Sequence, residues 1–446
     1  MISEFLNSEC FCVSLDQLAL KAALTKELET SEMAALVEER CPYLFSAHPV
    51  FVSDSQIQQM TQVIRAVEAV VSLPAYQEYV LSFAPPIAHH TAHGARSVFF
   101  GYDFHLTREG LGVIEINTNA GGAMLNAVMA RAHQACCLDD TRLERAAAAS
   151  AALEKNIIDM FFSEWQLAGL DRPLKTIAIV DVSPRQQYLY PEFILFQHVF
   201  ERSGLQAVIA DPNEFEMRDG RLVHGDRQID LVYNRLTDFK LDSPESAALR
   251  AAYLEGAIVL TPHPRAHALY ADKRNMALLC SDERLRAFGA PCDVREVLLK
   301  HILPTELVTQ ENAERLWSER RNLFFKPSSG YGSRAAYRGD KLTKRVWSEI
   351  LGGDYIAQAV MAPGERNSGS KNSPQPLKFD IRCYAYDGKI QWTAARMYQG
   401  QTTNFRTMGG GFAPVYALPD NVMMQCKNAA PGSGLNGAAC YNSMCQ

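Results

Sequence analysis

The sequence lacks any apolar run approaching the ~20 residues that a membrane span needs, and it has no excess of basic residues. Its 446 residues hold 44 Lys and Arg against 50 Asp and Glu, a net charge of −6. We therefore expect neither a nucleic acid nor a membrane as partner, because both favour a basic surface. The opening MISEFLNSECFCVSLDQ has no cationic leader before an apolar run, which predicts no secretory signal.

Three further patterns are missing. There is no CxxC pair of the kind that holds zinc. The P-loop pattern GxxxxGK[ST] is absent, and no GxGxxG follows the strand KTIAIVDV, so neither common nucleotide-binding fingerprint applies. The 11 cysteines are scattered and odd in number, which favours reduced thiols in a cytoplasmic protein.

The chain is long enough for roughly three domains of ~150 residues. Residues 14–82 are predicted to be helices with short breaks, ending before Pro85 and Pro86. Two strands around a turn follow in RSVFFGYDFHLTREGLGVIEINTN, and then a long Ala-rich helix from Thr141. From about residue 173, strand, helix and strand alternate as in a parallel βαβ unit.

The pattern changes near residue 272. A helix begins at DKRNMALL, a strand and glycine-rich loop at NLFFKPSSGYGSRA, and a β-hairpin turning at Asp387-Gly388 lies in LKFDIRCYAYDGKIQWTAARMYQG. TNFRTMGGGFAPV is interpreted as a glycine-rich loop. The last residues, 419–446, have no periodicity; with Cys426, Cys440 and Cys445 they are a disordered end, a redox-sensitive clasp or a segment that covers the site.

One strand carries an unusual pair of side chains. In GVIEINTNAGG, Glu115 and Asn117 are two residues apart and therefore share one face of the strand. Carboxylate and amide oxygens on a rigid support suit a hard divalent cation. The alternative is an edge strand with one solvated face.

Two other segments indicate nucleotide chemistry. Lys326 ends an apolar strand and opens a glycine-rich loop, an arrangement that suits phosphate oxygens, although a plain hairpin with a surface lysine remains open. DYIAQAVMAPGER has an apolar strand with Gln358 followed by Pro-Gly. It is either a core strand or an adenine-binding hinge, in which Glu365 meets a ribose hydroxyl.

Arg382, Arg396 and Arg406 lie across the hairpin and the following loop. Arg382 stands inside an apolar strand, where an unpaired cation is costly. Three arginines near a glycine loop favour recognition of phosphates or carboxylates. The alternative is salt bridging to Asp380, Asp387 or Glu365.

In their order, these segments resemble the ATP-grasp superfamily, in particular carboxylate–amine ligases such as ribosomal-protein glutamate ligases, D-alanine–D-alanine ligases and glutathione synthetases. The resemblance covers roughly residues 95–125 and 173–416. It implies an α/β (α+β) ATP-grasp fold, ATP, and two Mg²⁺ ions, with Mn²⁺ as an alternative. It also implies metal ligands Asp103, Glu115 and Asn117, and a nucleotide site of Lys273, Lys326, Ser328, Ser329, Gly330, Gly332, Gln358, Ala359, Val360 and Glu365.

The same resemblance implies a reaction. A substrate carboxylate attacks the γ-phosphate, Arg382 and Arg396 neutralise the developing charge, and Arg406 with Gly409 and Gly410 holds the acyl-phosphate until an amine attacks. The substrates would be an amino acid, peptide or polyamine. Further substrate contacts would come from Arg96, Asn119, Gly121 and Gly122. His89, His90 and His93 upstream either line the substrate site, bind a metal or form a solvated loop.

The order of the segments departs from most of the superfamily, because the metal segment comes before the lysines. It is similar to the circular permutation of eukaryotic glutathione synthetases and glutathionylspermidine synthetases. The division implied is a helical region at 1–92, permuted metal strands at 93–130, a linking helix at 131–172, a Rossmann-like substrate domain at 173–270, an ATP-grasp N-lobe at 271–355, a C-lobe at 356–416 and a flexible tail at 417–446. The sequence also permits a homodimer.

Two other functions fit these residues. An ATP-grasp phosphotransferase would leave the phosphate on its substrate, whereas a ligase releases it. A nucleotide-binding regulatory protein would have a degenerate site, and the complete set of Asp103, Glu115, Asn117, Lys273 and Lys326 argues against that reading.

Overall fold

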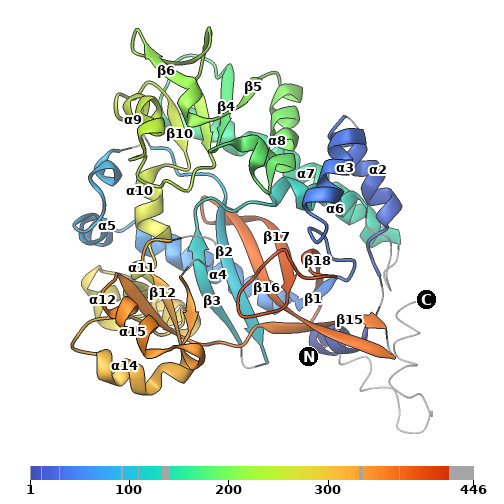
Figure 1. Cartoon of the computed structure of the whole chain (residues 1–446), viewed down its shortest axis with the longest axis vertical. Helices are drawn as coiled ribbons and strands as arrows, with labels where there is room; N and C mark the ends of the chain where they lie inside the picture. Colours follow the sequence, from blue (N-terminus) through green and yellow to red (C-terminus); the bar gives the residue numbers. More distant parts are fainter. Residues whose placement is uncertain are drawn as a thin grey trace.

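The computed structural model describes residues 2–11, 13–29, 31–91, 94–108, 110–132, 140–330, 335–370 and 372–420. Within these residues, three sheets form the architecture, and a fourth, small sheet is attached to one of them. In Figure 1 a parallel sheet lies at the top, a large curled sheet in the centre, and a smaller antiparallel sheet at the lower left. Among the described helices, none has both the length and the apolar character that crossing a bilayer requires.

The central sheet joins strands from both ends of the chain. Its order is β1-β18-β17-β16-β2-β3, with β15 paired to β16. In Figure 1 the teal strands β2 and β3 lie beside the orange strands β16 and β17. The bounds are β1 (Val50–Ser53), β2 (Phe100–Thr107), β3 (Gly110–Asn117), β15 (Gly364–Ser370), β16 (Ser373–Tyr386), β17 (Lys389–Tyr398) and β18 (Gly411–Leu418).

Both predicted hairpins of this sheet are confirmed. β2 and β3 pair antiparallel, and so do β16 and β17. Asp387 and Gly388 both have positive φ, at 50° and 68°, which is the backbone of the two-residue turns that fit the twist of a hairpin. The apolar residues of the sheet pack against α4 (Asp54–Val71), α5 (Pro74–Leu81) and α13 (Cys292–His301).

Two sequence predictions are wrong in this region. The segment 14–82 is not all helical, because β1 adds a parallel edge strand beside β18. The predicted loop 403–415 ends early, because β18 begins at Gly411 and pairs with β17. β1 gives no local signal because its partner strand, β18, lies far away in the sequence. β18 gives none because its residues do not alternate between apolar and polar.

The βαβ unit predicted from residue 173 forms a four-stranded parallel sheet in the order β10-β9-β4-β5. Its elements are β4 (Thr176–Val180), α8 (Tyr190–Arg202), β5 (Gln206–Ala210), β9 (Leu231–Asn234), α9 (Ala247–Leu254) and β10 (Val259–Thr261). The polar hairpin inserted before β9 gives the small sheet of β6 (Phe215–Arg218), β7 (Arg221–His224) and β8 (Arg227–Gln228).

The third sheet is antiparallel, in the order β11-β14-β12-β13. It is built from β11 (Thr305–Leu307), β12 (Leu323–Pro327), β13 (Tyr337–Arg338) and β14 (Tyr355–Ala359), and it packs on α14 (Ala313–Glu319) and α15 (Lys344–Leu351) through Leu316, Phe325, Trp347 and Ile350. The predicted boundary between residues 355 and 356 would cut β14.

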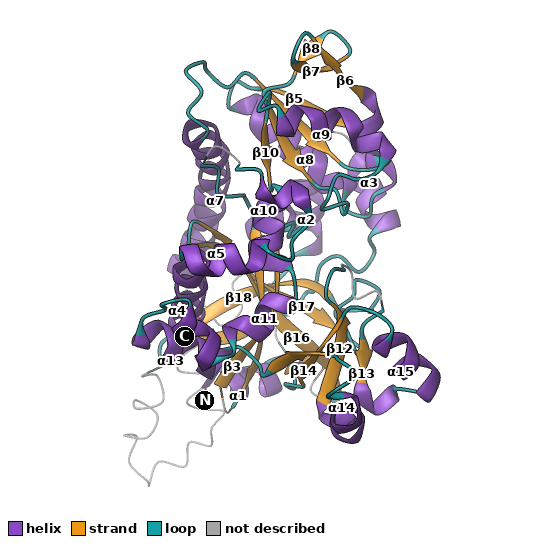
Figure 2. Cartoon of the chain, turned by 90° about the vertical axis from the view of Figure 1, so that its left-hand side faces the viewer, coloured by secondary structure: helices purple, strands orange, loops and turns teal. Residues whose placement is uncertain are grey.

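The remaining helices connect these units. The long predicted helix is α7 (Asp140–Leu167), which in Figure 2 runs along one side of the molecule from its upper to its lower part. The others are α1 (Ile2–Glu9), α2 (Gln17–Glu27), α3 (Ser31–Arg40), α6 (Ala123–Arg131), α10 (Pro264–Ala266), α11 (Arg274–Leu279) and α12 (Asp282–Ala287). Short turns of helix are η1 (Pro86–His89), η2 (Pro184–Gln186), η3 (Pro212–Glu214), η4 (Pro244–Ser246), η5 (His267–Ala271), η6 (Arg320–Asn322) and η7 (Gly339–Lys341).

Candidate functional site

A cavity of about 610 Å³ lies where the three sheets meet. Its wall takes residues from β2 and β3, from β12 and β14, from β16 and β17, and from the loops after β4, β9 and β17. The predicted site residues that line it are Asp103, Glu115, Asn117, Asn119, Lys273, Lys326, Gly330, Gln358, Ala359, Val360, Arg382 and Arg396.

The proposed metal ligands come together on the central sheet. Asp103 and Glu115 stand opposite each other on β2 and β3. Nδ2 of Asn117 lies 3.1 Å from Oδ2 of Asp103 and 3.3 Å from Oε1 of Glu115. An amide has a donor end and an acceptor end, so a half-turn of the Asn117 side-chain amide would present its oxygen to a cation.

Two arginines form ion pairs with Asp103. Arg382 donates to both of its oxygens at 2.7 Å, and Nη2 of Arg396 lies 2.8 Å from Oδ2. Glu115 and Asn117 therefore fit a divalent cation better than Asp103 does. In the part of the chain that the structure describes, no three His, Cys, Asp or Glu residues group as a metal site, so an ion here would also need oxygen ligands from a bound molecule.

Arg382 and Arg396 both form buried ion pairs, and of the carboxylates considered from the sequence they use only Asp380. Nε of Arg396 donates to Oδ1 of Asp380 at 2.7 Å, while Arg382 is bidentate on Asp103. All four side chains are buried, so two cations and two anions neutralise one another at the cavity floor. Their outer edges still line the cavity and can meet an anionic ligand.

The two lysines have neutral hydrogen-bond partners, although the charges of Glu115 and Asp103 also act on Lys326. Nζ of Lys326 donates to the carbonyl of Ile114 at 2.9 Å and to Oε1 of Gln358 at 2.8 Å. Nζ of Lys273 donates to the carbonyl of Gly330 at 2.9 Å. Burial lowers the pKa of Lys326 to about 8. Both ammonium groups thus face the cavity with neutral partners, which is an arrangement that attracts an anion.

The hinge and loop predictions are only partly matched by the geometry. The backbone N–H groups of Ala359 and Val360 donate to the carbonyls of Pro304 and Asn322. Glu365 is exposed on β15 and does not line the cavity. Ser328 and Ser329 do not line it either, and Gly332 lies outside the described residues.

Several predicted substrate residues lie away from the cavity. Arg96 pairs with Asp387, and Arg406 is exposed. Gly409 and Gly410 lie at the turn before β18. Gly121 and Gly122 do not line the cavity. His89 and His90 do not line the cavity, while His93 and the tail after Asp420 lie outside the described residues.

The structure adds a group that sequence reasoning missed. Asp181 follows β4 and Arg235 follows β9, and both line the cavity. Nε of Arg235 and Oδ1 of Asn119 are buried without a hydrogen-bond partner, which is costly unless a ligand or water satisfies them. Burial raises the pKa of Asp181 to about 6, and the charge of Arg235 opposes that rise. The signal available in the sequence was their place at the carboxyl ends of parallel strands, where ligands bind in such sheets.

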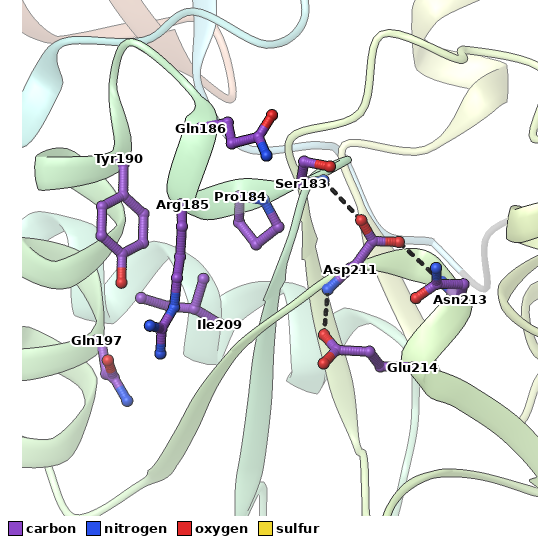
Figure 3. Close-up of a pocket in the computed structure, with 10 residues that line it drawn as sticks. All are labelled: Ser183, Pro184, Arg185, Gln186, Tyr190, Gln197, Ile209, Asp211, Asn213 and Glu214. Carbon is purple, nitrogen blue, oxygen red and sulfur yellow. Dashed lines mark hydrogen bonds between the residues drawn. The ribbon is translucent and has the colours of Figure 1, made fainter.

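A second cavity, of about 490 Å³, opens beside β4 and β5 (Figure 3). Its acidic side chains are engaged: Asp211 accepts from the backbone of Ser183 and Asn213, and Glu214 accepts from the backbone of Asp211. Arg185 and Tyr190 stand on the other side in Figure 3. Most of the residues that line it are exposed or half-buried, so this cavity is a weaker candidate for a binding site than the first.

Comparisons with known proteins find likeness in structure alone. No protein-family model and no curated protein matches the sequence. A glutathione synthetase-like effector from Globodera pallida in its apo form is similar with a TM-score of 0.55 and 11% identity, over 92% of this chain and 100% of that one. A putative gamma-glutamylcysteine synthetase from Methylobacillus flagellatus KT has a TM-score of 0.45 and 9% identity, over 89% and 95%. The chain thus has a glutathione synthetase-like fold, consistent with the ATP-grasp-like class that the sequence resemblance implied.

Proposed function

We propose that the protein is an ATP- and Mg²⁺-dependent ligase that joins a carboxylate to an amine. The observation that carries this proposal is the meeting of three kinds of group in one cavity. The same space is lined by two lysines whose hydrogen-bond partners are neutral, by the carboxylate–amide pair Glu115 and Asn117, and by Arg235, whose buried Nε has no hydrogen-bond partner. The glutathione synthetase-like fold supports the ligase class.

In this proposal Lys273 and Lys326 hold nucleotide phosphates, next to the backbone of β14. Glu115 and Asn117 hold the cation, and Mg²⁺ would supply charge neutralisation between the phosphates. Arg382 and Arg396, although paired with buried carboxylates, would donate hydrogen bonds to an anionic ligand from the edges that line the cavity. Arg406, Gly409 and Gly410 would act only after the loop that carries them closes over the cavity.

The substrate end of the cavity fits an amino-acid head group. Arg235 is the natural partner of a carboxylate, because its guanidinium offers an unused donor. Asp181 lies close enough to Arg235 for the two charges to interact, and it suits an ammonium. One substrate is therefore proposed to be an amino acid or a short peptide with a free zwitterionic end.

The proposed chemistry has two steps. A carboxylate oxygen of the substrate forms a bond to the γ-phosphorus of ATP, and the bond to the β–γ bridging oxygen breaks, releasing ADP. The amine nitrogen then attacks the acyl carbon, inorganic phosphate leaves, and the amine loses a proton. Closure of the cavity would keep water from competing with the amine.

The chain order is part of the proposal. β2 and β3 precede the lysines in sequence, yet β2 pairs with β16 and β3 pairs with β2 in the same sheet. A circular permutation of an ATP-grasp domain would produce this arrangement, since the termini of compact domains often lie close together.

The test is a screen for ADP release with Mg²⁺-ATP over pairs of amino acids, peptides and amines, followed by mass spectrometry. A ligase gives an amide together with ADP and free phosphate. A phosphotransferase leaves the phosphate on the substrate, and either that result or no ADP release with any pair would overturn the proposal.

A further inference from the structure

Glu192 is a fully buried carboxylate in the first turn of α8, a helix that packs against β4 and β5 of the parallel sheet and against α6. Its two oxygens accept the backbone N–H of Gly122 at 2.8 and 2.9 Å, and Oε1 also accepts that of Met124 at 3.2 Å. These groups form the N-terminus of α6, whose own N-cap residue, Gly122, offers no side chain. Glu192 thus caps α6 from another unit of the fold.

Glu192 also faces the substrate arginine. Nη2 of Arg235 lies 3.8 Å from Oε2 of Glu192, and both side chains are buried. Gly121 leaves room for this pair, because a Cβ on Gly121 would lie 2.8 Å from Nη2 of Arg235 and 3.4 Å from Oε2 of Glu192.

The loop that Glu192 holds continues directly from the metal strand. Between Asn117 and α6, Nδ2 of Asn119 donates to the carbonyl of Leu236 at 2.7 Å. The hydroxyl of Tyr384 donates to the carbonyl of Gly121 at 2.7 Å. The end of β3 and the residues around Arg235 are therefore tied into one hydrogen-bonded unit, and the carboxyl group of Glu192 joins its two sides. Burial raises the pKa of Glu192, while the charge of Arg235 and the N–H groups of Gly122 and Met124 oppose that rise.

We propose that Glu192 is a positioning residue that sets the strength of carboxylate binding at Arg235 and fixes the loop after Asn117 relative to it. The inference rests on the proposed function, because it assigns Arg235 to the substrate. The charge of Glu192 weakens the attraction of Arg235 for a second carboxylate, while its hydrogen bonds hold the metal strand in register with the substrate.

Glu192→Gln separates these two effects. The variant keeps the shape of the side chain but removes the counter-charge of Arg235, so a substrate carboxylate should bind more tightly, by about fivefold. The amide NH₂ cannot accept from Gly122 and would face the guanidinium, so the loop loses its fixed position. Turnover should then fall by about 10- to 100-fold, as for other supporting residues around a metal.

Glu164→Gln is the matched control. Glu164 is equally buried and accepts two backbone N–H groups, from Arg96 at 2.8 Å and Ser97 at 3.0 Å, but its other partners are the hydroxyls of Thr261 and Tyr386 rather than an arginine. A merely structural carboxylate predicts that both Gln variants lower the thermal midpoint and that neither tightens binding.

The experiment measures the dissociation constants of γ-glutamylcysteine and L-glutamate by calorimetry, and ADP release with the best substrate pair. The inference expects tighter binding and slower turnover in Glu192→Gln, unchanged binding in Glu164→Gln, and partial return of both quantities in Glu192→Asp. Weaker or unchanged binding in a folded Glu192→Gln overturns it. A wild-type protein that binds neither probe and releases no ADP with any pair overturns the proposed function itself.

Discussion

Lys326 at the end of β12 donates a 2.9 Å hydrogen bond to the carbonyl of Ile114 in β3, so the lysine strand and the metal strand are joined directly. Its ammonium is buried, and burial lowers its pKa to about 8. Because Ile114 directly precedes Glu115 in β3, the contact places a titratable cation close to a proposed metal ligand. It gives the candidate site a pH dependence of known sign.

We expect the affinity for a non-hydrolysable ATP analogue to fall as pH rises above 8, because only the ammonium form of Lys326 attracts phosphates. Between pH 7 and 9 the charged fraction drops by up to about tenfold, and the dissociation constant should rise correspondingly. Calorimetry at the two pH values measures this, and Lys326→Gln should flatten the profile. Equal affinity of the wild-type protein at pH 7 and 9 would contradict the assignment.

Stability should move in the opposite direction. The folded-state pKa of Lys326 lies below that of an unfolded lysine, so the unfolded chain binds more protons between about pH 8 and 10.5. The contribution of this residue to the free energy of unfolding therefore rises with pH in that window. Weaker nucleotide binding above pH 8 cannot then be attributed to loss of the Lys326 side chain's contribution to folding.

Glu115→Gln should abolish most of the Mg²⁺-dependent activity. The substitution keeps the size of the side chain and its contact with Asn117, but it removes the charge that a divalent cation requires. We expect ADP release to fall by about 10²–10³-fold. The measurement is ADP release as a function of Mg²⁺ concentration.

The control for this variant is Glu365→Gln, because Glu365 is exposed on β15 and outside the cavity. It should keep the wild-type Mg²⁺ response. If Glu115→Gln also keeps it, Glu115 does not hold the metal.

Gly121→Ala should damage substrate binding and leave the nucleotide site intact. The added Cβ would lie 2.4 Å from Cδ1 of Leu189 and 2.8 Å from Nη2 of Arg235, so it would push both of these cavity-lining side chains out of place. A misplacement of about 1 Å can cost up to ~10²-fold in rate, so turnover should fall strongly while the affinity for the ATP analogue stays unchanged. Gly352→Ala is the matched control, because the nearest atom to its Cβ would be 3.5 Å away. An unchanged turnover in Gly121→Ala would show that Arg235 has room to move or is not needed.

The parts of the site that were predictable from sequence depend on local patterns. Glu115 and Asn117 share a face because a strand alternates with period two, and that rule needs no knowledge of the partner strand. Lys326 was recognised because it ends an apolar strand before glycines. The structure brings these residues to one cavity, although their roles stay predictions.

The parts that were missed depend on distant contacts. β1 has only four residues, and its partner β18 lies more than 350 residues later, so no local pattern announces the pairing. The guanidinium of Arg406 suits a phosphate or carboxylate, but its position depends on the conformation of the loop between β17 and β18. Asp181 and Arg235 were overlooked although each lies near the end of a predicted strand, because no motif marks them without the rule that ligands gather at strand ends.

The last prediction concerns the N-terminal segment. Arg366 on β15 is completely buried, and its guanidinium donates to the carbonyls of Pro49 at 2.7 Å and Asn7 at 3.1 Å. It also lies 5.7 Å from the centre of the Phe51 ring. Arg366 therefore holds α1 and the residue before β1 against β15 of the central sheet.

Arg366→Met keeps much of the side-chain length but leaves those two carbonyls without this donor in a dry environment. We expect the free energy of unfolding to fall by about 3 kcal/mol, because hydrogen bonds to a charged group contribute about 1.5–3 kcal/mol each. Urea unfolding measures the loss, and hydrogen exchange should rise first in residues 2–11 and 50–53. Because β1 and β3 lie at opposite edges of the sheet, the affinity for the ATP analogue should not change.

Arg345→Met supplies the comparison, since the side chain of Arg345 is 89% exposed and pairs with Glu349 one helical turn away. An exposed pair of this kind is worth less than about 1 kcal/mol, so this variant should unfold almost as the wild type does. If both variants lose the same small amount, the backbone contacts of Arg366 do not hold the N-terminal segment. If Arg366→Met also weakens binding of the ATP analogue, the edge strand β1 is coupled to the cavity across the whole sheet, and the two edges cannot be treated as independent.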